Sequence, residues 1–134
     1  MAKITFSVVT PEGADLEAEV LSATLPGIMG ELCVLPQHCP GLIQLGGGLV
    51  SYEGIEGNDS FFVRGGVAEI GREHIRVLTD AMSRPGEVER SEAERLVAEA
   101  DALLERADAV GDELLRSAET DRGYGEAILK SIGQ

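Results

Sequence analysis

Single polar residues separate apolar ones near the start of the chain, which is the pattern of a strand that buries one face. Ile4, Phe6 and Val8 define that face, and the turn residues 11–13 end the run. Further apolar or mixed runs follow at close spacing, at residues 16–25, 32–35, 49–52, 61–63, 67–70 and 74–79. No helical pattern lies between these short strands, so they predict an all-β sandwich or barrel, and we place a sandwich domain at residues 1–86.

Glycines are concentrated in this N-terminal part, and we interpret them as turn residues. Residues 46–48 are three consecutive glycines before the strand that starts at Leu49, and Gly65 and Gly66 split the segment VRGGVAEIG into two short strands. The chain contains no GxxxxGKS/T pattern and no GxGxxG that opens a helix. We therefore expect no glycine-rich phosphate-binding loop.

The pattern changes to helical spacing after residues 84–86, which read Arg-Pro-Gly. Ser91 and Glu94 have the spacing of a capping box at a helix N-terminus. Apolar residues then recur at intervals of three and four: Leu96, Val97, Ala100, Leu103, Leu104, Ala107 and Val110. This pattern predicts an amphipathic helix that ends near Gly111.

A second helical pattern follows, with Asp112 as its expected N-cap. Gly123 and Gly125 lie inside it, and each internal glycine costs about 1 kcal/mol relative to alanine. We therefore expect a break or fraying at these two glycines. The short connection predicts an antiparallel α-helical hairpin for residues 87–134.

Charge and composition exclude several classes of partner. The 134 residues carry a formal net charge of −13, shared by both parts, with 4% aromatic residues and no tryptophan. Such a chain repels nucleic acid and anionic membranes, and it lacks platforms for stacking bases. No apolar run approaches the roughly 20 residues that span a bilayer, and the start has no signal-peptide pattern. These features predict a cytoplasmic protein without direct membrane insertion.

The segment from Gly27 to Leu42, GIMGELCVLPQHCPGL, combines turn residues with an apolar run. Pro36 ends that run by removing a backbone donor, and Pro40 favours an extended backbone before it. We expect a rigid tip that carries three polar side chains: Glu31, Gln37 and His38.

Chemistry at this tip is not expected. Cys33, His38 and Cys39 could supply three zinc ligands, but no fourth follows at finger-like spacing. His38 has no identifiable nucleophile with an orienting carboxylate, and His74 has the position of a surface residue. The carboxylates of the first helix match its solvent face. We predict no catalytic residue, metal site or cofactor.

The order and spacing of several motifs resemble the epsilon subunit of the rotary (F-type) ATP synthase, over nearly the whole chain. The motifs are GEL at residues 30–32, Pro36, His38 and Pro40 within LPxHxP, VRGGVAEI at 63–70 and VLTDA at 77–81. The resemblance implies a β-sandwich followed by a helical hairpin, in a subunit that is not itself catalytic.

The resemblance also implies partners. Members of the family sit on the central stalk, where the sandwich binds the gamma subunit and its lower end contacts the polar loops of the c-ring. By position in the motif, Glu31 would face the ring, and His38 would lie in the loop near gamma. Pro36, Gln37 and Pro40 complete the predicted partner interface. The hairpin could restrain ATP hydrolysis by contacting the alpha/beta catalytic head. The expected location is peripheral, at the cytoplasmic face of the plasma membrane.

Two features depart from the family. Some bacterial members bind ATP through a hairpin motif I/L-D-x-x-R-A, whose positions here are Val88, Glu89, Glu92 and Ala93, so a glutamate replaces the arginine. The alternative register, from Glu92, recovers an arginine but loses the flanking residues. Inverting the charge that would face a phosphate predicts weak or absent ATP binding. Acidic residues also outnumber basic ones over residues 113–134, which disfavours an inhibitory contact with acidic partners.

Two alternatives from other classes remain at this point. One is a small metal-dependent β-sandwich enzyme that uses His38 and His74, and it predicts metal in the purified protein. The other is an acidic adaptor with a helical docking hairpin, for which gamma would not be the dominant partner.

Overall fold

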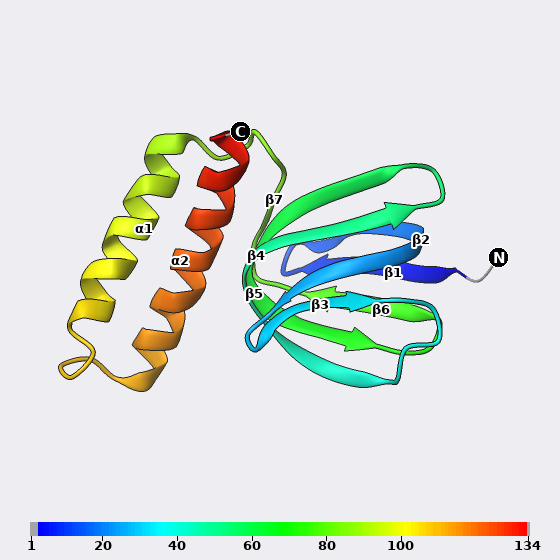
Figure 1. Cartoon of the computed structure of the whole chain (residues 1–134), viewed down its shortest axis with the longest axis horizontal. Coiled ribbons are helices and arrows are strands. Elements are labelled where there is room, and N and C mark those ends of the chain that lie inside the picture. The colour runs from blue at the N-terminus through cyan, green and yellow to red at the C-terminus, as the bar shows by residue number, and fades with distance from the viewer. Residues whose placement is uncertain (1–2, 134) are drawn as a thin grey trace.

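The computed structural model describes residues 3–133 as a sheet-rich N-terminal part and a two-helix hairpin at one end of it (Figure 1). The strands are β1 (Ile4–Thr10), β2 (Gly13–Gly27), β3 (Gly30–Val34), β4 (Gly41–Gly54), β5 (Asn58–Ile70), β6 (His74–Leu78) and β7 (Met82–Ser83). The helices are α1 (Arg90–Glu105) and α2 (Asp112–Ile132). Met1, Ala2 and Gln134, at the outer ends of the two predicted domains, lie outside the described residues.

The strands form one sheet that closes on itself. Its order is β1-β6-β5-β4-β2-β3, and β1 also pairs with β2, which joins the two sides of the sheet. The β1–β6 pair is parallel, and the other pairs are antiparallel. β3 extends the edge of β2, and β7 pairs with β5. The predicted all-β sandwich followed by a helical hairpin is confirmed.

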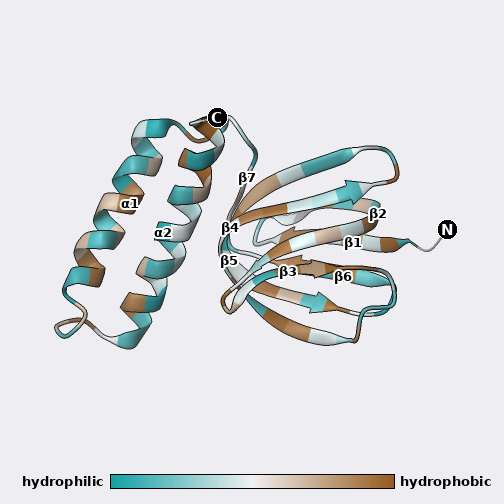
Figure 2. Cartoon of the chain, in the orientation of Figure 1, coloured by the Kyte–Doolittle hydropathy of each residue, from teal (hydrophilic) through white to brown (hydrophobic). Residues whose placement is uncertain are grey.

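The apolar core fills the interior of this closed sheet. In β1, burial alternates along the strand, so that Ile4, Phe6 and Val8 point inward as predicted. The ring of Phe6 lies 5.3 Å from that of Tyr52 and 6.2 Å from that of Phe61, measured between centroids. Figure 2 shows the same alternation of apolar and polar positions along the strands.

Two glycine predictions are wrong. β4 runs unbroken through the three glycines at residues 46–48, and β5 is one strand rather than two. At Gly65 and Gly66 the φ angles are +83° and +131°, and here β5 exchanges its neighbour β7 for β6. The hydrogen-bonded ladder to β4 continues past this point, so the glycines reshape a strand without ending it.

The helix boundaries also differ from the prediction. Glu89, not Ser91, occupies the N-cap of α1, and no side chain caps this helix end. Ser91 and Glu94 lie inside the helix, so the capping box does not form. The helix ends at Glu105, where the Arg106 N–H donates to the carbonyl of Leu103 and turns the chain before Val110.

α2 is continuous from Asp112 to Ile132, so the predicted break at its glycines is wrong too. Asp112 is its first helical residue, and Gly111 takes the N-cap position. A Cβ atom added to Gly125 would lie 2.8 Å from Cγ2 of Val97 on α1. The glycine is therefore a packing position, which lets the two helices approach closely.

Tyr52 offers a test of how the edge of this core is built. Burial raises the pKa of Tyr52, and the Asp59 carboxylate raises it further, while Arg84 partly opposes both. In a Tyr124→Phe chain, we expect Tyr52 to ionise above the ordinary pKa of about 10, and tyrosinate absorbance measures this titration.

The raised pKa also links folding to pH. Because the folded-state pKa of Tyr52 is raised, its contribution to the free energy of unfolding is fully present below the unfolded-state pKa. That contribution is lost as pH rises through the folded value. Ionisation of Tyr52 at the same pH in the folded and the urea-unfolded chain would contradict this expectation.

Candidate functional site

The first predicted interface residue lies beside a tight turn. Gly27 pairs with Gly30 across the β2–β3 turn, and Glu31 follows in β3, exposed and opposite Pro26. The turn presents Ile28 and Met29, whose side chains are 56% and 95% exposed. Exposed apolar side chains beside a carboxylate fit a contact surface better than a catalytic pocket.

The other predicted residues form a loop with a defined turn. Pro36 occupies the second position of this turn, Gln37 has φ +69° at the third, and the His38 N–H donates to the Leu35 carbonyl at 3.2 Å. This is the pattern of a type II turn, with glutamine in the place where glycine is usual. The Gln37 N–H also donates to the Arg72 carbonyl at 2.9 Å, which fastens the loop to the β5–β6 turn.

The single tip expected from the sequence does not exist. Glu31 lies near the start of β3, and the rest of the strand, residues 32–34, separates it by roughly 10 Å from the loop that holds Gln37 and His38. Figure 1 shows the β2–β3 turn at the hairpin end of the sandwich and the loop after β3 at the opposite end. Strand formation by the run after Gly30 therefore divides the predicted surface in two.

A shallow groove of about 950 Å³ lies beside the loop, lined by Gln37, Pro40, Leu42 and residues 69–74. Glu69 contacts His74 Nε2 at 3.3 Å and Arg76 Nη1 at 3.5 Å, and His74 is exposed as predicted. The Nδ1 atom of His38 lies 2.8 Å from the Cys39 carbonyl oxygen. Among the side chains that the structure describes, no group of three or more His, Cys, Asp and Glu residues is placed to hold a metal ion.

The four residues of the altered nucleotide motif have separate positions. Val88 and Ala93 pack inside the hairpin, whereas Glu89 is the N-cap of α1 and Glu92 is exposed in its first turn. Other charges of the hairpin pair with one another. Arg122 donates to Asp101 at 2.6 Å across the two helices and contacts Glu126 at 2.8 Å.

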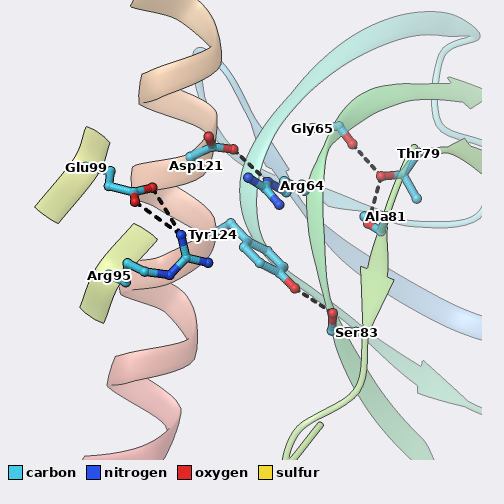
Figure 3. A network of polar contacts seen from close by, with 9 residues as sticks. All are labelled: Arg64, Gly65, Thr79, Ala81, Ser83, Arg95, Glu99, Asp121 and Tyr124. Atoms are coloured by element: carbon cyan, nitrogen blue, oxygen red, sulfur yellow. Dashed lines mark hydrogen bonds and ion pairs between the residues drawn. The ribbon is translucent and has the colours of Figure 1, made fainter. Parts of the chain in front are cut away.

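A polar cluster at the junction of hairpin and sandwich was not identified from the sequence (Figure 3). Arg64 on β5 donates through Nε to Asp121 on α2 at 2.7 Å, and its guanidinium lies 5.7 Å from the centre of the Tyr124 ring. The Tyr124 hydroxyl lies 2.5 Å from that of Ser83 on β7. The hydrogen bond with Asp121 raises the pKa of Arg64 and so stabilises the charged guanidinium in this pair.

Thr79 joins two of the sequence motifs, VLTDA and VRGGVAEI, through hydrogen bonds. Its buried hydroxyl lies 2.7 Å from the carbonyl oxygen of Gly65 and 3.1 Å from that of Ala81. The VLTDA segment is thus tied to the bend of β5 at Gly65. The sequence signals for the junction are the motifs that contain Arg64 and Thr79 and the glycines, whose pattern predicts turns and a helix break.

These features define the class of the molecule: a closed β-sandwich with a helical hairpin docked at one end. Residues 3–85 match the family described as "ATP synthase, Delta/Epsilon chain, beta-sandwich domain". The chain is 33% identical over 132 residues to the ATP synthase epsilon chain of Granulibacter bethesdensis, which covers 95% of this chain and 98% of the relative. It is 35% identical over 124 residues to that of Moorella thermoacetica, covering 80% and 92%. The chain therefore belongs to the ATP synthase epsilon chain family, and the resemblance is confirmed.

Solved structures show the same fold at lower identity. A chain of the Euglena gracilis mitochondrial ATP synthase, solved as OSCP/F1/c-ring, has a TM-score of 0.76 at 19% identity, covering 98% of this chain and 82% of that one. A chain of the Tetrahymena thermophila mitochondrial ATP synthase central stalk and c-ring has a TM-score of 0.51 at 16% identity, covering 68% and 69%. In the part of the chain that the structure describes, no helix is long and apolar enough to cross a bilayer.

Proposed function

We propose that this chain is a rotor subunit of the central stalk in an F-type ATP synthase, where it couples rotation of the c-ring to ATP synthesis without catalysing a reaction itself. The similarity to bacterial epsilon chains carries this proposal, because it extends through both the sandwich and the hairpin. The two structural neighbours come from assemblies that contain a c-ring. We place the protein peripherally at the cytoplasmic face of the plasma membrane and take the proton as the driving ion.

The geometry supports a division of the partner interface. The loop with Pro36, Gln37, His38 and Pro40 would bind gamma, and Glu31 beside the β2–β3 turn would contact the polar loops of the c-ring. A coupler that carries torque needs contact segments that do not slide. The hydrogen bond from the Gln37 N–H to Arg72 gives the loop such an anchor.

Reconstitution with gamma tests the proposal. We expect a one-to-one complex, and Leu42→Glu, beside the loop on a 73% exposed side chain, should weaken it by about tenfold or more. Ile55→Glu is the matched control, because Ile55 is 53% exposed and lies in the β4–β5 turn. The proposal fails if no complex forms. Equal weakening by both variants would exclude the loop as the gamma contact.

ATP binding to the hairpin should be weak or absent. Glu92 stands where a phosphate-binding arginine would be needed, and Arg122 is already paired with Asp101 and Glu126. A phosphate would therefore meet carboxylates and an occupied cation. Calorimetric titration of the isolated chain with ATP should give no measurable heat of binding, and micromolar affinity would contradict the prediction.

Removing the hairpin should change ATP hydrolysis by the assembled enzyme very little. We expect this because the acidic C-terminal helix is poorly suited to an inhibitory contact with the catalytic head. The chain would be truncated after Gly86, with Phe62→Thr added because the hairpin covers Phe62. Full-length Phe62→Thr is the control. A severalfold rise in the hydrolysis rate on truncation would refute the prediction.

A further inference from the structure

The hairpin contacts the sandwich backbone to backbone. A Cβ atom added to Gly47 on β4 would lie 1.9 Å from the Thr120 carbonyl oxygen on α2, and one added to Gly123 would lie 2.4 Å from the Gly47 carbonyl oxygen. Both distances are far below ordinary contact, so only glycine fits at either position. One glycine from each element is therefore needed for this fit.

Side chains on both sides of this contact hold it in place. Arg64 pairs with Asp121 and lies against the Tyr124 ring, and the Tyr124 hydroxyl reaches Ser83. Figure 3 shows these side chains bridging α2 and the strands. Phe62 of β5 joins the apolar cluster of the two helices, so separation would expose that ring together with Tyr124.

Glycines at two packing positions also weaken α2: Gly123 lies against β4 of the sandwich, and Gly125 lies against α1. Gly123 and Gly125 lie two residues apart inside α2, and glycine is the poorest helix former after proline. Most helical stability in proteins comes from tertiary packing rather than from intrinsic propensity. The unbroken helix seen here therefore depends on its packing, which on the sandwich side is the contact with β4 and β5.

We infer that docking of the hairpin and helicity of residues 120–132 are one cooperative event. Under this inference, the hairpin does not separate from the sandwich while residues 120–132 stay helical. Loss of the Gly47–Gly123 contact exposes Tyr124 and frays the C-terminal half of α2 together. This inference concerns the isolated chain and does not rest on the proposed function.

Gly123→Ala separates this inference from simple helix propensity. Alanine is the better helix former, so propensity alone predicts slower amide hydrogen exchange in residues 120–132. Coupling of docking to helicity predicts faster exchange, by at least about tenfold, because the added methyl group forces α2 away from Gly47. Ser117→Ala, at an exposed position of α2, is the propensity control and should hold or raise protection.

Gly47→Ala should speed exchange in residues 120–132 although it lies on β4, whereas Gly41→Ala, on the same strand with open space around it, should not. Asp121→Asn, which leaves the glycine contact intact, is the milder variant if either glycine variant fails to fold, and it should speed exchange in the same segment.

Fluorescence gives a second measurement. With Tyr52→Phe as background, Tyr124 is the only tyrosine, and quenching of its fluorescence by acrylamide reports undocking. Unchanged or slower exchange in Gly123→Ala would overturn the inference. So would an exposed Tyr124 with amides 120–132 still protected.

Discussion

Replacing Phe6 with alanine should lower the free energy of unfolding by about 3–5 kcal/mol. The Phe6 side chain is fully buried and packs against the rings of Tyr52 and Phe61, so its loss leaves a cavity between β1 and the paired strands β4 and β5. Domains of this size have roughly 5–15 kcal/mol of stability in total, so the variant would lose much of it. Urea unfolding followed by far-ultraviolet circular dichroism measures the change.

Met29→Ala is the control for Phe6→Ala, since its side chain is 95% exposed in the β2–β3 turn. We expect its effect to stay within about 0.5 kcal/mol. A loss of less than about 1 kcal/mol in Phe6→Ala would show that the sheet collapses around the deleted ring. The closed strand order would then be less rigid than the structure indicates.

Gly66→Ala should lower the free energy of unfolding by about 2–5 kcal/mol, nearly as much as Phe6→Ala. Gly66 has φ +131°, where a side chain is strained, and an added Cβ would lie 2.1 Å from the Leu78 carbonyl oxygen and 3.0 Å from Cα of Thr79. Those atoms belong to the backbone at the end of β6, so no rotamer change can relieve the overlap. The midpoint of thermal unfolding should fall accordingly.

Gly46→Ala provides the comparison for Gly66→Ala. Its added Cβ would meet its nearest neighbours at 3.9 Å, which is ordinary contact, and its φ angle is not in the left-handed region. We expect little change there. Equal unfolding temperatures for the two variants would mean that β5 can straighten at Gly66, contrary to the exchange of neighbours seen in the structure.

The loop after β3 shows how far sequence reasoning reached at the site. Pro36 ends the strand-forming run as predicted, and Glu31, Gln37 and Pro40 are exposed, whereas Pro36 and His38 are half-buried. The relative position of these residues was wrong, because a tip was assumed where five residues form a strand. Distance along a strand depends on pairing with a partner, which no local pattern reports.

The sequence by itself determined the alternating strands, the change to helical spacing after Gly86 and the family to which the chain belongs. Each of these depends on short-range order, in which side-chain period and turn residues act within a few positions. Only the tertiary structure decided what the glycines do. Gly47, Gly123 and Gly125 have no side chain to show a preference, and their role is the close approach of segments far apart in the chain. The pairing of Arg64 with Asp121, separated by 57 residues, arises from the same contact.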